Sequence, residues 1–146
     1  MIVSLATPQI LRVRASRGDD PEPTIDWTVR LGDFEYERNG VRGDKVYLRP
    51  FVGHLRVDGA SAWGDIDVTS LLVSNEATDF DEVMETIETT DAIETLYRFA
   101  RATLAPLVLG LDDSAAIPEF SPAATVEKLE LSDEEPDSGD APNPVD

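Results

Sequence analysis

Residues 93–111, IETLYRFARATLAPLVLGL, carry the clearest pattern in the chain. Apolar residues recur there every three or four positions, which is the spacing of one face of an α-helix. They are Ile93, Leu96, Tyr97, Ala100, Leu104, Leu107, Val108 and Leu111. Pro106 lacks an amide hydrogen, so we expect the helix to kink there or to end its regular part early. A helix with one apolar face must pack on another part of the chain.

The flanks of this stretch predict where the helix begins and ends. Asp91 and Glu94 have the spacing of a capping pair, so we expect a helix over residues 91–110 with Gly110 as its C-cap. Glu94 also precedes Arg98 by four residues, which predicts an ion pair between them.

A shorter helix is predicted just upstream, over residues 79–88, with Thr78 or Asp79 as its cap. Its inward-facing residues are expected to be Phe80, Val83, Met84 and Ile87.

Earlier in the chain the periodicity is that of β-strands. Apolar and polar residues alternate over residues 9–17, 24–31, 45–58 and 63–74, with turn-forming residues between them. Because the connections are short, we expect consecutive strands to pair antiparallel. The alternation changes phase after Gly32, which predicts a β-bulge there. Pro50 cannot donate to a sheet ladder, so it is expected at an edge, a bulge or a break.

Four strands followed by two helices indicate an α+β fold. We predict a four-stranded antiparallel sheet packed on one face by a short and a long C-terminal helix, all within one domain of residues 1–131. Residues 132–146 hold six acids and three prolines, and their only aliphatic side chains are Ala141 and Val145. This segment is predicted to be a disordered acidic tail.

The net charge of the chain is −18, and it is unevenly distributed. Acids and bases balance within residues 1–58, whereas residues 59–146 hold the whole excess of acid. Such a field repels nucleic acid and membrane phosphate and attracts basic partners. The alternative is that the charge serves solubility, or reflects a high-salt or GC-rich source, since arginine outnumbers lysine ten to two.

The composition excludes several classes of protein. The chain has no cysteine, which excludes disulfides, thiolate nucleophiles and cysteine-ligated zinc. Its first residues do not resemble a signal peptide, and no stretch is apolar for long enough to cross a membrane. We therefore expect a soluble cytoplasmic protein without membrane insertion.

No pattern of residues indicates catalysis or metal binding. His54 is the only histidine, and the chain has no nucleophile elbow of the serine hydrolase type. Asp65 and Asp67 share a strand face and could bind a hard cation, but paired acids on a polar face are normally solvated. We predict a non-enzymatic protein with no metal, no cofactor and no nucleic-acid partner.

Two stretches resemble the SecB-type chaperone family. The first, 51-FVGHLRVDG-59, is similar to the family's third strand in its apolar residues around a polar pair. The second, 96-LYRFARATLAPLVLGL-111 followed by 117-IPEFSPAATVEKL-129, resembles the family's long helix, proline-bearing segment and short last helix. The chain departs from the family in SLLVSNE (70–76), which has no Gly-Gly pair, and in its acidic rather than basic tail, EEPDSGDAPNPVD (134–146).

The resemblance implies a cytoplasmic, ATP-independent holdase that binds unfolded or slowly folding client polypeptides, or a dedicated protein partner. It also implies a homo-oligomer, a dimer of dimers. The alternative function is that of a non-catalytic acidic protein that sequesters a basic partner or mimics nucleic acid.

A sheet covered on one face leaves apolar surface that invites partners, and this surface is where we expect clients to bind. The candidate client-binding residues are Trp27, Val29, Phe34, Tyr36, Phe51, Leu55, Leu107 and Phe120. Parity leaves open whether Trp27 and Val29 face the helix or the outside. The alternative for all eight residues is ordinary core.

Overall fold

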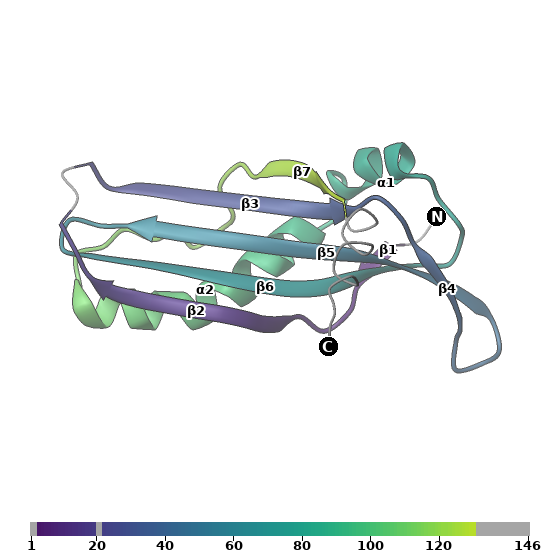
Figure 1. The fold of residues 1–146 in the computed structure, drawn as a ribbon, viewed down its shortest axis with the longest axis horizontal. Coiled ribbons are helices and arrows are strands. Elements are labelled where there is room, and N and C mark those ends of the chain that lie inside the picture. The colour runs from purple at the N-terminus through teal and green to yellow at the C-terminus, as the bar shows by residue number, and fades with distance from the viewer. Residues whose placement is uncertain (1–2, 20–21, 131–146) are drawn as a thin grey trace, which may run out of the picture.

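The computed structural model describes residues 3–19 and 22–130 (Figure 1), so the predicted acidic tail, residues 132–146, lies outside the described residues. The strands are β1 (Val3–Leu5), β2 (Gln9–Arg17), β3 (Thr24–Gly32), β4 (Tyr36–Asn39), β5 (Lys45–Asp58), β6 (Ala62–Ser74) and β7 (Thr125–Leu129). The helices are α1 (Phe80–Ile87) and α2 (Ala92–Leu111). Both predicted helices and all four predicted strands are present, each end within one residue of its predicted place.

The described strands form a seven-stranded mixed sheet, which corrects the prediction of a four-stranded antiparallel one. The order is β1-β6-β5-β3-β7, with β2 also paired to β6 and β4 also paired to β5. β2 pairs with β6 rather than with β3, its neighbour in sequence. Arg12 and Arg14 of β2 stand opposite Asp67 and Asp65 of β6, and these opposite charges favour the long-range pairing.

The segment after α2 forms a strand where the family resemblance implied a short helix. β7 runs parallel to β3, with Val126 beside Val29 and Glu127 beside Arg30. Val126 packs against the core, and Arg30 Nε lies 2.9 Å from Glu127 Oε1. Successive side chains of β7 therefore contact the hydrophobic core on one face of the sheet and Arg30 on the other.

Gly32 and Pro50 lie in a gap between the ladder that joins β3 to β5 and the ladder that joins β4 to β5. β3 ends at Gly32 and β4 begins four residues later, so the phase change predicted as a bulge is a break in the strand. β5 pairs with β3 from Phe51 onward and with β4 only as far as Leu48. Pro50 therefore lies where no described strand is paired on that side of β5, which suits a residue without an amide hydrogen.

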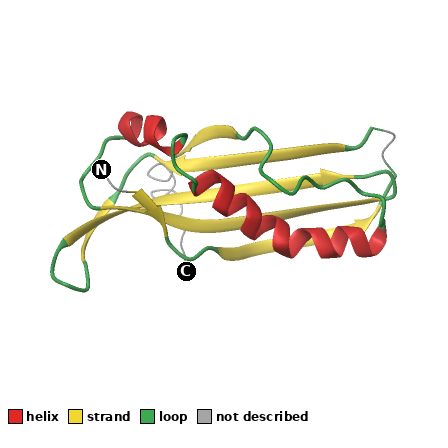
Figure 2. Cartoon of the chain, turned by 180° about the vertical axis from the view of Figure 1, so that it is seen from behind, coloured by secondary structure: helices red, strands yellow, loops and turns green. Residues whose placement is uncertain are grey.

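α2 runs diagonally across one face of the sheet (Figure 2). Its buried residues, Ala92, Leu96, Tyr97, Ala100, Leu104, Ala105 and Val108, meet the apolar residues of β3, β5 and β6. The helix continues through Pro106 to Leu111 and is followed by Asp112 as C-cap, so neither the early end nor the cap predicted at Gly110 is observed.

The two helices begin differently. Asp79 caps α1 in a capping box with Glu82, as one of the two predicted caps. Asp91 makes no side-chain capping hydrogen bond at α2, so the predicted capping pair is wrong there. Glu94 instead accepts a 3.0 Å hydrogen bond from Arg98, which confirms that predicted ion pair.

Candidate functional site

Four of the eight predicted client-binding residues lie in the core. Trp27, Val29, Phe51 and Leu55 lie beneath the helices, and none is more than 2% exposed. Trp27 makes an edge-to-face contact with Tyr97 of α2, with ring centroids 5.5 Å apart. Trp27 and Val29 therefore face α2 and not the outside, which parity alone had left open. These four are core residues, covered by α2.

The other four are more exposed but lie at three separate places. Tyr36 of β4 is 46% exposed, Leu107 of α2 is 44% exposed, and Phe120, in the segment after α2, is 57% exposed. Phe34 is half-buried, with its ring centroid 5.6 Å from that of Tyr36. The structure does not bring the predicted residues together into one site.

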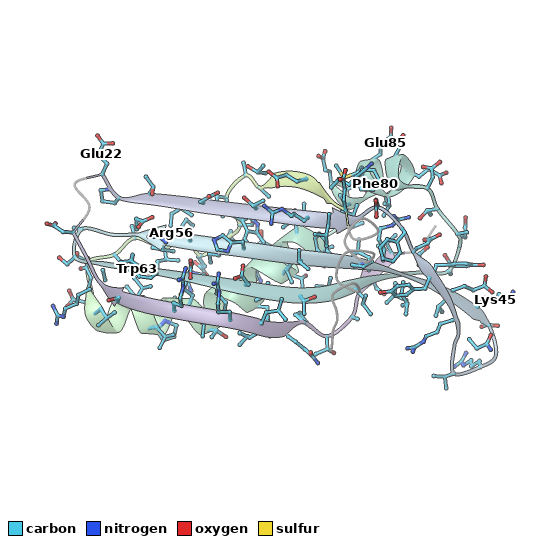
Figure 3. All side chains as sticks on the ribbon, viewed as in Figure 1. Glu22, Lys45, Arg56, Trp63, Phe80 and Glu85 are labelled. Atoms are coloured by element: carbon cyan, nitrogen blue, oxygen red, sulfur yellow. The ribbon has the colours of Figure 1, made fainter. Side chains whose placement is uncertain are left out.

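The face of the sheet opposite α2 has no helix over it among the described residues, and we call it the open sheet face (Figures 1 and 2). A polar ladder crosses this face on three neighbouring strands, and Figure 3 shows Arg56 and Trp63 on it. The ladder consists of Arg12 and Arg14 of β2, Trp63, Asp65 and Asp67 of β6, and His54, Arg56 and Asp58 of β5.

Asp65 is the buried centre of the polar ladder, at 2% exposure. Arg14 donates to both of its oxygens, over 3.0 Å from Nε and 2.7 Å from Nη2. These hydrogen bonds from Arg14 lower the pKa of Asp65 and outweigh the rise that burial causes. Arg14 and Arg56 also lie over the ring of Trp63, at 5.4 Å and 4.6 Å from its centroid. Asp65 therefore holds the ladder together as a carboxylate.

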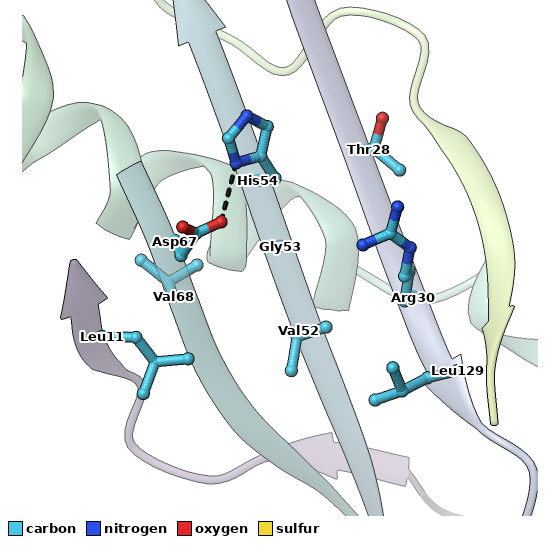
Figure 4. Close-up of a pocket in the computed structure, with 9 residues that line it drawn as sticks. All are labelled: Leu11, Thr28, Arg30, Val52, Gly53, His54, Asp67, Val68 and Leu129. Atoms are coloured by element: carbon cyan, nitrogen blue, oxygen red, sulfur yellow. Dashed lines mark hydrogen bonds and ion pairs between the residues drawn. The ribbon is translucent and has the colours of Figure 1, made fainter. Parts of the chain in front are cut away.

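Asp67 is held by two cross-strand neighbours. Its Oδ1 lies 2.7 Å from His54 Nδ1 (Figure 4), and its Oδ2 accepts hydrogen bonds of 2.7 Å and 3.0 Å from Arg12. Asp65 and Asp67 are thus engaged by arginines, where the sequence had suggested solvated acids. Over residues 3–19 and 22–130, no group of three or more His, Cys, Asp or Glu side chains could hold a metal ion.

Two adjoining apolar hollows lie beside the polar ladder on the open sheet face. The smaller, of about 210 Å³, is lined by Leu11, Thr28, Arg30, Val52, Gly53, His54, Asp67, Val68 and Leu129 (Figure 4). The larger, of about 490 Å³, is lined by Ala6, Thr7, Gln9, Tyr36, Pro50, Val52, Thr69, Ser70, Leu71 and Leu129. Val52 and Leu129 line both hollows, and Tyr36 is the one predicted site residue found here.

Leu11 is a lining residue that alternation alone misplaces. Simple parity puts Leu11 on the same face as Val13, under the helix. The register shifts between Ile10 and Arg12, and Leu11 is 64% exposed at the smaller hollow. A bulge of this kind leaves no signal in the apolar pattern of β2.

A third hollow, which we call the loop groove, lies between the start of β3, the end of β5 and the segment after α2. It measures about 640 Å³ and is lined by Pro23, Thr24, Ile25, Val57, Asp58, Gly59, Ala115, Ala116, Ile117 and Pro118. Most of these residues are apolar, and the groove contains none of the eight predicted residues. The only signal in the sequence was a run of apolar residues in the proline-bearing segment.

The outer wall of the loop groove is tied to α2. The Tyr97 hydroxyl donates a 2.6 Å hydrogen bond to the Pro118 carbonyl. Arg101 donates to the same carbonyl over 2.8 Å and to the Ile117 carbonyl over 3.1 Å. Burial raises the pKa of Tyr97, so its hydroxyl keeps the proton that it donates. The wall is therefore positioned by two side chains of the long helix.

The comparisons with known proteins find similarity among solved structures. No family model matches the chain, and no curated protein matches it. Among solved structures, the chain is similar to the Mycobacterium tuberculosis Rv1957 SecB-like chaperone in complex with a ChAD peptide from the Rv1956 HigA1 antitoxin. The TM-score is 0.48 and the sequence identity 16%, over 83% of this chain and 91% of that chain. Neither described helix is long and apolar enough to span a membrane.

Proposed function

We propose that this chain is an ATP-independent chaperone of the SecB-like type, which holds an unfolded client polypeptide, or a dedicated protein partner, in the loop groove. The observation that carries the proposal is the groove itself. Its volume of about 640 Å³ and its mostly apolar lining are typical of sites that bury ligand side chains. An extended polypeptide offers apolar side chains of that size at regular intervals.

Binding in the loop groove needs no cofactor and no reaction step. Burial of client side chains against Ile25, Ala116 and Ile117 supplies the favourable free energy, at about 25 cal/mol per Å² of apolar surface. The net charge of −18 adds attraction for basic clients.

Mimicry of nucleic acid is less well supported by the geometry. Such mimicry requires rows of acids that are free to meet a basic partner. On the open sheet face, Asp65 and Asp67 are instead bound by Arg14 and Arg12. The two functions differ in their response to salt, since an electrostatic complex weakens steeply as salt rises and an apolar one does not.

The test of the proposed function is suppression of aggregation without ATP. Guanidine-denatured luciferase is diluted into buffer with and without the protein, and light scattering is followed. The parent chain is expected to suppress scattering. Ile117→Asp, which places a charge in the loop groove, is expected to lose most of this effect. Ala123→Asp is the matched control, because Ala123 is exposed in the same segment and does not line the groove.

We also propose that the chain works as a homo-oligomer, a dimer of dimers, as the family resemblance implies. Sedimentation equilibrium should then give a mass four times the 16.0 kDa of one chain. A monomer that protects no denatured client would contradict both parts of the proposal.

A further inference from the structure

The carboxylate of Asp112 joins the two walls of the loop groove. We call residues 23–25 and 57–59 the inner wall, and residues 115–118 the outer wall. Asp112 Oδ2 accepts a 3.0 Å hydrogen bond from the Ser61 N–H, in the turn that follows the inner wall. Asp112 Oδ1 accepts hydrogen bonds of 3.0 Å from the Ser114 N–H and 2.6 Å from the Ser114 hydroxyl, directly before the outer wall. These three hydrogen bonds form what we call the clasp.

The clasp is anchored in regular structure on both sides. The Ser61 carbonyl accepts a 3.0 Å hydrogen bond from the Gly18 N–H, which follows the last residue of β2. Asp112 is the C-cap of α2 and donates its own N–H to the Val108 carbonyl over 2.9 Å. Figure 1 shows the C-terminal end of α2 and the turn between β5 and β6 at the same end of the sheet. The clasp therefore fixes the start of the outer wall relative to the sheet.

The outer wall is a short strap that is held at both ends. The clasp fixes its start. Its end is fixed by α2, because Tyr97 and Arg101 donate hydrogen bonds of 2.6 Å and 2.8 Å to the Pro118 carbonyl. Without the clasp, the start of the strap would be released from Ser61 and from the inner wall.

The two walls come close together beside the clasp. A Cβ atom placed on Gly59 would lie 3.3 Å from Asp112 Oδ2 and 3.4 Å from Ala115 Cβ. These are close van der Waals contacts, so the walls here are separated by less than the width of one further side chain. A small shift of Asp112 therefore changes the width of the groove.

Asp112 stands where a carboxylate is electrostatically unfavourable. The C-terminal end of a helix carries partial negative charge, which favours basic residues there and disfavours acidic ones. The last turn of α2 contains no basic residue, and Asp112 is only 8% exposed. The hydrogen bonds from Ser114 and Ser61 nevertheless lower the pKa of Asp112, so it stays ionised. An unfavourable charge that is held in place by three hydrogen bonds points to a role other than stability.

We infer that Asp112 is a positioning residue of the loop groove, which holds the outer wall at the distance from the inner wall that a client segment requires. This inference rests on the proposed function and names what controls the width of that same site. Client side chains are buried against both walls at once, so a wall that is already in place need not be ordered when the client binds. By linkage, a client that binds the clasped groove more tightly must in turn stabilise the clasp.

Asp112→Asn tests the inference by keeping the shape of the side chain while replacing one acceptor oxygen with an NH₂ group, which cannot accept a hydrogen bond. The probe is fluorescein-labelled, reduced and carboxamidomethylated ribonuclease A, which stays unfolded in native buffer, and fluorescence anisotropy gives its Kd. Asp112→Asn should weaken binding about tenfold. Its unfolding midpoint should stay close to that of the parent, because the substitution also removes a negative charge from the C-terminal end of α2. Asp113→Asn, at the exposed next residue, is the control and should bind as the parent does.

Ser114→Ala removes the shortest hydrogen bond of the clasp at an exposed residue, and should weaken probe binding about threefold. The double variant of Asp112→Asn and Ser114→Ala should bind no more weakly than Asp112→Asn alone, because the clasp is already open. Losses that add would show that the two residues do not act through one clasp, and would overturn the inference. If Asp112→Asn does not fold, Ser114→Ala carries the test.

Amide hydrogen exchange tests the linkage on the unaltered protein. The amides of Ser61 and Ser114 donate to Asp112, so their exchange should slow by about tenfold when the probe is bound. The amide of Asp112 donates to Val108 and should exchange at the same rate with and without the probe.

The possible results separate this inference from the proposed function. If the parent binds the probe and Asp112→Asn binds it equally well, or the exchange of the Ser61 and Ser114 amides does not slow, the inference is overturned and the holdase function stands. If affinity and stability fall together in Asp112→Asn, the residue has only a structural role and the inference is also overturned. If the parent binds no unfolded probe, both fail.

Discussion

Gly64 and Gly53 let α2 lie directly on the sheet. A Cβ atom at Gly64 would come within 2.6 Å of Val108 and 2.9 Å of Leu104. A Cβ atom at Gly53 would come within 2.7 Å of Trp27 and 3.0 Å of Leu96. The two glycines lie under α2 on neighbouring strands, so they set the distance between the two layers.

Gly64→Ala is expected to lower the free energy of unfolding by about 1–3 kcal/mol, the usual cost of overpacking a core. Urea denaturation followed by tryptophan fluorescence measures it. Gly110→Ala in α2 is the control, because nothing lies within 4 Å of the added Cβ, and alanine favours a helix by about 1 kcal/mol. Equal stability of the two variants would mean that the contact at Gly64 is not tight.

Asp65 predicts how stability depends on pH. Its pKa is lowered in the folded chain, chiefly by the hydrogen bond from Arg14, from an ordinary value of about 3.9. The stability that Asp65 contributes is therefore fully present above that value and is lost as pH falls through the lowered pKa. Asp65→Asn should be less stable at neutral pH and should lose less stability on acidification.

Denaturant midpoints measured between pH 2 and pH 7 would check this expectation. Asp113→Asn, at an exposed residue just after α2, is the control and should follow the parent curve. If the denaturant midpoints of Asp65→Asn and of the parent fell equally as pH is lowered, Asp65 would not be the cause of the pH dependence of stability.

At the scale of elements, the N-caps of α1 and α2 can be compared directly, because an aspartate stands at each. The Asp79 side chain accepts a 2.9 Å hydrogen bond from the Glu82 N–H, and the Glu82 carboxylate accepts one of 3.0 Å from the Asp79 N–H. Asp91 makes no such bond. Asp79→Ala should therefore cost about 1 kcal/mol of unfolding free energy, and Asp91→Ala only a few tenths. Thermal unfolding of both variants measures the difference, and a larger loss at Asp91 would contradict the assignment of the caps.

At the scale of the whole molecule, the domain boundary yields a deletion test. Every residue of the buried core cluster lies between Trp27 and Val108. Removal of residues 132–146 should therefore leave the unfolding midpoint within error of the parent value. A chain that no longer unfolds cooperatively after this deletion would place the boundary of the domain elsewhere.

Much of the fold was predictable because periodicity is local. The spacing of Ile93, Leu96 and Ala100 was enough to locate α2, and alternation located the four longest strands. Periodicity does not say which strand a strand pairs with, so the partnership of β2 with β6 was missed. It also does not distinguish two faces of a sheet, which is why Trp27 was assigned to a binding surface and lies in the core.

The candidate site was predicted less well than the fold. The loop groove is walled by Ile117 and Pro118, which belong to no repeating pattern and are positioned by Tyr97 and Arg101 from far along the chain. Contacts of this kind depend on the packed arrangement of α2 on the sheet. They can be read only once that arrangement is known.

The partnership between β2 and β6 also constrains the order of folding. The partner strand of β2, Ala62–Ser74, leaves the ribosome some fifty residues after β2 itself. Until then β2 has no strand to pair with. The entropy lost in closing the chain between β2 and β6 must be offset before their pairing stabilises the fold. The hairpin of β5 and β6 can form locally. We therefore expect this hairpin to form first and β2 to pair with it afterwards. A nascent chain of this protein thus spends part of its own synthesis with an unpaired strand exposed, the condition that chaperones exist to relieve.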